Sequence, residues 1–193
     1  MTIEPDITEL LERYNCPHPL TVVRMRFWGA INSPAARISP IEEIDALWSG
    51  KRRPFETEDE AQAFYDVVIG FWNALAEHRA SGKPVAFAMR SGLKTSAGLK
   101  SAMAARYAEL SDGFFSGFIG NLRPREPVDS GIDRNLHKLS DVIDEIEELM
   151  EGPIGPGNVN KVRSRFVALD KRAQKLVNQA VMQTWVAARS RYQ

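Results

Sequence analysis

The sequence predicts an all-α protein, a helical bundle that ends in an antiparallel helical hairpin. Apolar residues recur at three- and four-residue steps in several segments, which is the period of a helix with one buried face. Helix-start signals precede two of these segments, and clusters of glycine and proline separate others. With 193 residues, 44% of them hydrophobic, the chain can form one domain or two small domains with a real core.

Two capping boxes predict where helices begin. In Ser39-Pro40-Ile41-Glu42 the serine can accept a hydrogen bond from the third helical N–H, and proline suits the first helical position. Thr57-Glu58-Asp59-Glu60 repeats the box, with three carboxylates where the helix dipole favours negative charge. Adjacent carboxylates on a helix point in different directions, so this acidic cluster is interpreted as a cap rather than as a catalytic or metal site.

The flanking segments predict the order helix, short helix, basic loop, long helix. Residues 20–31 form a helix that Asn32-Ser33-Pro34 ends, and Gly50 closes the short helix. Lys51-Arg52-Arg53 lies in a loop, where a run of charge is usually solvated. The long helix ends at Gly82 and Pro84, and its apolar face comprises Ala61, Phe64, Tyr65, Val68, Phe71, Trp72 and Leu75. A further helix starts near Thr95 or Ser96.

These landmarks resemble those of the YecA/YgfB-like family of helical bacterial proteins. The likeness lies in the Asn32-Ser33-Pro34 turn, Ile38 with Pro40, Ala46-Leu47-Trp48-Ser49-Gly50, the acidic cap and the helix rich in Phe and Trp. Asp112-Gly113-Phe114-Phe115-Ser116-Gly117-Phe118 is similar to a glycine-and-aromatic helix in the second half of the family domain. The resemblance spans roughly residues 6–122 and implies a helical domain over residues 1–122 that interacts with another protein.

Two departures limit what the resemblance implies. Family members usually carry an Asp-Gly pair in the helix before the proline turn, where this chain has Arg24-Met25, so a function tied to that pair does not carry over. Some members end in a cysteine-rich zinc-binding tail linked to protein export factors. This chain has a single cysteine, Cys16, and ends on a long helix, so zinc does not carry over either.

Residues 123–193 predict a hairpin of an acidic helix against a basic helix. Six carboxylates lie between Asp141 and Glu151, and the final helix can run for about 30 residues, or ~45 Å. The stretch Gly152–Gly157 is too rich in glycine and proline to be helical, and Asn158 can cap the final helix. Exposed ion pairs contribute only ~0.2 to 1 kcal/mol each, so apolar burial should hold the hairpin together while charge selects its register. The hairpin is either a separate lobe or packed on the first domain.

Gly113, Gly117 and Gly120 fall on one helix face. This spacing indicates either a site where a ligand or partner backbone comes close or a tight helix crossing inside the core, and the crossing is favoured. Phe114, Phe115 and Phe118 are expected in the core.

The sequence predicts no catalytic residues, no cofactor and no metal site, and we expect a protein that is not an enzyme. The three histidines are scattered, and Cys16-Pro17-His18 offers at most two metal ligands. Ser91 and Lys94 have the spacing of a nucleophile pair without its companion motifs. The region from Gly92 to Lys100 lacks the glycine and lysine order of a phosphate-binding loop.

The function expected is that of a helical protein-interaction or regulatory protein whose partner is another protein; a homodimer is also compatible with the sequence. The alternative is nucleic-acid or ribosome association through the basic stretch 79–106 and the outer face of the final helix. That face comprises Lys161, Arg165, Lys171, Arg172, Lys175 and Arg189. Zero net charge and a pI near 6.9 argue against the alternative. The chain shows no signal sequence and no apolar run long enough to cross a membrane, so no membrane contact is expected and the location predicted is the cytoplasm.

Overall fold

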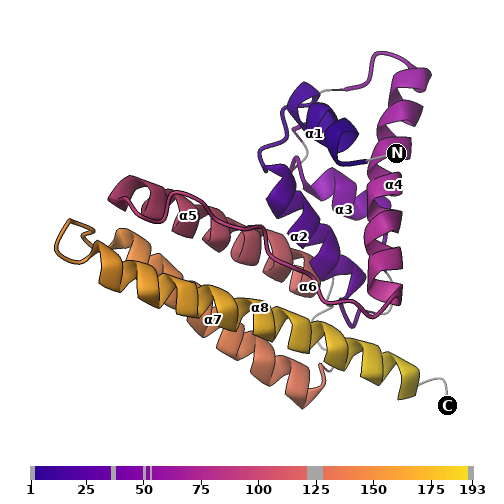
Figure 1. Cartoon of the computed structure of the whole chain (residues 1–193). Coiled ribbons are helices and arrows are strands. Elements are labelled where there is room, and N and C mark those ends of the chain that lie inside the picture. Colours follow the sequence, from indigo (N-terminus) through magenta and orange to yellow (C-terminus); the bar gives the residue numbers. More distant parts are fainter. Residues whose placement is uncertain (1–2, 36–37, 50, 53, 121–127, 191–193) are drawn as a thin grey trace. The chain divides into compact units, whose positions relative to one another are not determined.

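The computed structural model describes residues 3–35, 38–49, 51–52, 54–120 and 128–190, with side chains from residue 6 to residue 186 within those ranges. The elements are α1 (Ile3–Arg13), α2 (Leu20–Ile31), α3 (Pro40–Ala46), α4 (Glu58–Ala80), α5 (Ser96–Ala108), a π-helical segment (Glu109–Phe115), α6 (Ser116–Gly120), α7 (Ser130–Glu151) and α8 (Val159–Ser190) (Figure 1). No strand occurs in these ranges. The predicted all-α fold class is therefore confirmed.

The chain divides into two compact units. The first unit comprises residues 1–83 and 113–123, and the second comprises residues 84–112 and 124–193. The predicted boundary at residue 122 placed residues 84–112 with the first unit. They belong to the second unit, because α5 packs on α7 and α8. Periodicity shows that α5 has an apolar face, but it does not say which helices cover that face.

The predicted helix starts are confirmed by side-chain hydrogen bonds. Ser39 Oγ accepts from the N–H of Glu42 at 3.3 Å, and Thr57 Oγ1 accepts from the N–H of Glu60 at 3.1 Å. Thr95 caps α5 in the same way, accepting from the N–H of Gly98 at 3.1 Å. Each cap satisfies one of the backbone donors that a helix leaves unpaired in its first turn. Gly50 and Arg53, which belong to the predicted loop, lie outside the described residues.

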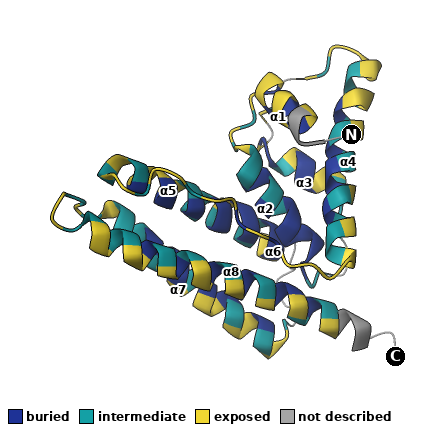
Figure 2. Ribbon diagram, viewed as in Figure 1, coloured by how far each residue is buried: buried dark blue, intermediate teal, exposed yellow. Residues whose placement is uncertain are grey.

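In the first unit, most residues of α2 are buried and none is exposed (Figure 2). It packs closely on the segment that contains α6. A Cβ atom added at Gly117 would overlap the carbonyl oxygen of Arg26, and one added at Gly113 would lie 2.8 Å from Cβ of Met25. A Cβ at Gly29 would likewise overlap the carbonyl oxygen of Phe114. The predicted tight crossing is thus confirmed for Gly113 and Gly117, whereas the space around Gly120 is open.

In the second unit, α7 and α8 form the predicted antiparallel hairpin. Both helices show a buried stripe and an exposed one in Figure 2, as expected for amphipathic partners. The buried stripes comprise Ile132, Leu136, Leu139, Val142, Ile143 and Ile146 of α7 and Phe166, Leu169, Ala173, Leu176, Val177, Ala180 and Val181 of α8. In the connecting loop, Asn158 Oδ1 accepts from the N–H of Gly155, and its Nδ2 donates to the carbonyl of Pro153, each at 2.8 Å.

Replacing Gly117 with alanine tests the α2–α6 packing. The added methyl group would meet backbone atoms that cannot move away independently, so we expect Gly117→Ala to lower the free energy of unfolding by about 1–3 kcal/mol. Gly70→Ala in α4 is the matched control, because no atom lies within 4 Å of its Cβ position. Removing a glycine from a helix interior should leave stability unchanged or raise it by up to ~1 kcal/mol. Urea unfolding measures both variants, and equal stability of the two would contradict the close packing.

Candidate functional site

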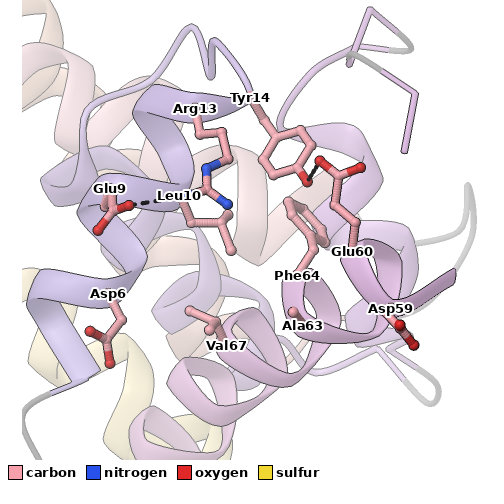
Figure 3. A pocket seen from close by; sticks show the side chains of 10 residues that line it. All are labelled: Asp6, Glu9, Leu10, Arg13, Tyr14, Asp59, Glu60, Ala63, Phe64 and Val67. Atoms are coloured by element: carbon pink, nitrogen blue, oxygen red, sulfur yellow. Dashed lines mark hydrogen bonds and ion pairs between the residues drawn. The ribbon is translucent and has the colours of Figure 1, made fainter. Parts of the chain in front are cut away.

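The first unit contains a cleft between α1 and α4 with a volume of about 410 Å³ (Figure 3). Its lining comprises Asp6, Glu9, Leu10, Arg13 and Tyr14 of the α1 region and Asp59, Glu60, Ala63, Phe64 and Val67 of α4. These residues recur at three- and four-residue steps along each segment, so each segment presents one side to the cleft. The site is not visible as a sequence motif, although Asp59 and Glu60 belong to the predicted capping box, because the cleft forms only where the two helices meet.

The floor of the cleft is apolar. Leu10 and Tyr14 contribute from one side, and Phe64 and Val67 contribute from the other. Phe64 is only 1% exposed, so its ring belongs to the core and presents an edge of that core to the cleft. A ligand group entering the cleft would therefore bury apolar surface.

The rim of the cleft is acidic. Four carboxylates and one guanidinium line the site, so its net charge is negative. Glu9 forms an exposed ion pair with Arg13 at 3.1 Å, and Glu60 accepts a hydrogen bond from the Tyr14 hydroxyl at 2.6 Å. Asp6 and Asp59 are exposed, come from different helices, and form no ion pair or hydrogen bond with another described residue.

Glu60 therefore has two roles. Its second carboxylate oxygen accepts from the backbone N–H of Glu56 at 2.6 Å, one residue before the N-cap Thr57 that a capping box would use, and this bond supports the turn before α4. Its bond to Tyr14 also ties α4 to the end of α1, across 46 residues of sequence. The acidic cluster interpreted as a cap is thus also part of the candidate site.

Tyr14 and Phe64 of the cleft belong to a cluster of aromatic rings. Phe64 contacts Tyr14, with ring centroids 5.0 Å apart, and Phe55, at 5.2 Å. The Trp48 indole donates to the carbonyl oxygen of Tyr14 at 2.8 Å, which fixes the chain at the end of α1. Ring-to-ring contacts of this kind contribute about 0.5–1.5 kcal/mol beyond the area they bury.

Arg52 is part of this cluster, and its predicted exposure as a solvated loop residue was wrong. Its Cζ lies 4.6 Å from the ring centroid of Phe55 and 4.7 Å from that of Phe64. Its guanidinium also pairs with Asp45 at 3.2 Å, and the Arg52 side chain is only 19% exposed. In the sequence, Arg52 looks like part of a solvated charge run. Its guanidinium can also pack through its planar face, so the aromatic residues nearby in the sequence could have indicated its position.

The predicted basic face is present on one side of α8, although part of it is paired. Arg165 and Arg172 both contact Glu145 of α7, at 3.1 and 3.4 Å. Lys161, Lys171 and Lys175 are exposed and form no ion pair with another described residue. The side chain of Arg189 lies outside the described residues. The structure thus leaves three lysines of the predicted six residues available to an anionic partner.

The basic stretch 79–106 is less available than predicted. Arg106 is 1% exposed, contacts Glu109, and pairs with Asp170 at 2.5 Å. Arg90 also pairs with Glu109, at 2.5 Å. Neither arginine can act as the surface phosphate contact expected from the sequence. Met103, Arg106 and Glu109 follow one another at three-residue steps and therefore lie on one side of the helix. Because Met103 is buried, this spacing could have indicated a buried ion pair between Arg106 and Glu109.

The buried charge of Arg106 serves the packing of the second unit. Its guanidinium lies 4.1 Å from the ring centroid of Phe87 and donates to the carbonyl of Ala88 at 3.0 Å. Burial lowers the pKa of Arg106, while Glu109 and Asp170 act in the opposite direction and favour the charged form. Arg106 thereby holds the extended segment 84–90 beside α5 and α8.

Replacing Arg106 with methionine tests this network. The change removes the cation that pairs with Asp170 and leaves buried Glu109 with Arg90 alone, so we expect the free energy of unfolding to fall by about 1–3 kcal/mol. Arg172→Met is the matched control, because it removes an arginine from a partly exposed pair and should cost less than about 1 kcal/mol. Urea unfolding of both variants measures the difference, and similar losses would show that Arg106 is not a special position.

Neither a metal-ligand cluster nor a membrane-spanning helix occurs in the described part of the chain. No group of three or more His, Cys, Asp or Glu side chains is arranged there to hold a metal ion. No described helix combines the length and apolar character needed to cross a membrane. Comparisons with protein-family models, curated proteins and solved structures gave no significant match.

Proposed function

We propose that this protein binds another protein and that the α1–α4 cleft is its binding site. The observation that carries the proposal is an apolar floor beneath carboxylates of which two, Asp6 and Asp59, have no partner among the described residues. A volume of about 410 Å³ lies within the range of about 300–1,000 Å³ that is usual for ligand sites. The resemblance of residues 6–122 to the YecA/YgfB-like family favours the same class of function.

The chemistry of the cleft supports binding rather than catalysis. Its described lining contains no histidine, cysteine, serine, threonine or lysine. The hydroxyl of Tyr14 donates to Glu60, and Arg13 pairs with Glu9, so the remaining polar groups are carboxylates at the rim. Protein interfaces often combine an apolar centre with a polar rim, and such a site can hold one anchoring side chain of a partner.

Filling the cleft tests the proposal. Ala63 is exposed and lines the cleft, so Ala63→Trp should occupy the space that the partner uses. Tagged protein is used to capture partners from lysate of its own host, with and without nuclease, and bound proteins are identified by mass spectrometry. We expect Ala63→Trp to reduce recovery of a nuclease-resistant partner by about tenfold or more, the effect of losing one good anchoring contact.

Ala80→Trp is the control for this experiment. Ala80 is exposed in the last turn of the same helix and does not line the cleft, so the variant adds the same ring away from the site. Circular dichroism and thermal unfolding confirm that both variants fold. Undiminished capture by Ala63→Trp would rule out the cleft as the binding site.

The alternative function is nucleic-acid or ribosome association through α8. The specific observation in its favour is that Lys161, Lys171 and Lys175 are exposed and unpaired among the described residues. Lysines on one side of a helix can displace counterions from a phosphate backbone, and the resulting affinity falls steeply as salt concentration rises. Binding in the α1–α4 cleft, whose floor is apolar, should respond less steeply to salt than binding to a phosphate backbone.

Reversing charges on α8 separates the two functions. We expect Lys171→Glu with Arg172→Glu and Lys175→Glu to leave the fold intact but remove partner binding if α8 is the site. Arg172 already pairs with Glu145, so the sharper variant reverses only the two lysines. Its matched control reverses Arg134 and Lys138, which are exposed and four residues apart on α7. Electrophoretic mobility shift with short duplex RNA and DNA measures affinity, and unchanged affinity in the α8 variants would eliminate the basic face.

A further inference from the structure

We infer that the α1–α4 cleft takes a lysine or arginine side chain of the partner protein. This inference rests on the proposed function and names the chemistry of the occupant. The charge of the rim points to a cation, because Asp6 of α1 and Asp59 of α4 both lie there without a partner among the described residues. Arg13, the one cation in the described lining, is engaged with Glu9 at 3.1 Å. Asp6 and Asp59 therefore leave a negative charge at the rim that a cation of a partner would complement.

The floor restricts the occupant further. A lysine or arginine has an aliphatic stem that can cover Leu10, Phe64 and Val67 while its charged head stays at the rim. A purely apolar side chain would cover the same floor. It would also displace water from the nearby carboxylates without replacing the hydrogen bonds that the water makes. An acidic side chain or a phosphate group would be repelled. Figure 3 shows Asp6 and Asp59 on opposite sides of the floor.

The same unit already contains a guanidinium held by this combination of groups. Arg52 lies over Phe64 and Phe55 while Asp45 neutralises its charge at 3.2 Å. Phe64 belongs both to that arrangement and to the cleft lining. The cleft offers the partner part of this chemistry, the aliphatic surface of Ala63 and Val67 beside carboxylates, while the buried ring of Phe64 supports that surface from below.

Short peptides test the inference on the full-length chain. The probes are four acetylated and amidated pentapeptides with glycine at every position except the third, which is lysine, arginine, norleucine or glutamate. Norleucine has the aliphatic stem of lysine without its charge. Backbone amide shifts of the ¹⁵N-labelled protein are followed at physiological salt. We expect the lysine and arginine peptides to shift Leu10, Phe64 and Val67, and to bind at least about tenfold more tightly than the norleucine peptide.

Paired variants establish which carboxylates act. Asp6→Asn with Asp59→Asn should abolish the preference for lysine over norleucine. Glu58→Gln with Asp66→Asn makes the same change in net charge at exposed residues of α4 that do not line the cleft, and the preference should persist. Thermal unfolding of both double variants confirms that they are folded.

The outcomes distinguish this inference from the proposed function. Equal binding of lysine and norleucine peptides, or a lysine preference that survives in the Asp6 and Asp59 double variant, would overturn the inference. The proposed function would still stand if Ala63→Trp abolished capture of the partner. Absence of any shift at cleft amides with millimolar lysine or arginine peptide would also overturn the inference. Partner capture that Ala63→Trp leaves undiminished would overturn both.

Discussion

The packing of Phe64 is the interaction on which the candidate site depends. Its ring contacts Tyr14 of the α1 region, Phe55 of the loop before α4 and the guanidinium of Arg52. These contacts join segments that are distant in sequence, and the Tyr14 to Glu60 hydrogen bond adds a polar tie at the same place. Because the ring is buried among these groups, it fixes the separation of α1 and α4 and hence the depth of the cleft.

The chain has no net charge, yet its cations are used in three physically different ways. Arg52 packs on aromatic rings with a carboxylate at its side. Arg106 is buried and shares Glu109 with Arg90, so its charge is neutralised inside the second unit. The lysines of the basic face of α8 remain in solvent. Counting charges along a chain cannot separate these cases, since burial and pairing change what a cation can bind.

The two candidate functions depend on different surfaces and different forces. The proposed protein binding at the α1–α4 cleft would rely on apolar burial, with carboxylates selecting the occupant. The alternative, nucleic-acid binding at α8, would rely on charge alone, and Glu145 already pairs with two of the arginines. Exposed pairs of this kind are weak, so Glu145 reduces the basic face without removing it. The cleft is favoured because shape and charge act there together.

Local rules in the sequence by themselves determined several helix starts and the hairpin, but they gave no prediction for α1. Caps at Ser39 and Thr57 depend on bonds within one helical turn, and the apolar stripes of residues 130–151 and 159–190 require a partner face. Only the tertiary structure decided that α5 packs with the hairpin and that Asp6 and Asp59 share one cleft. It also decided the surroundings of two arginines, since Arg52 packs on aromatic rings and Arg106 is buried. Periodicity reports which side of a helix is apolar, whereas desolvation and site assembly depend on which distant segment covers that side.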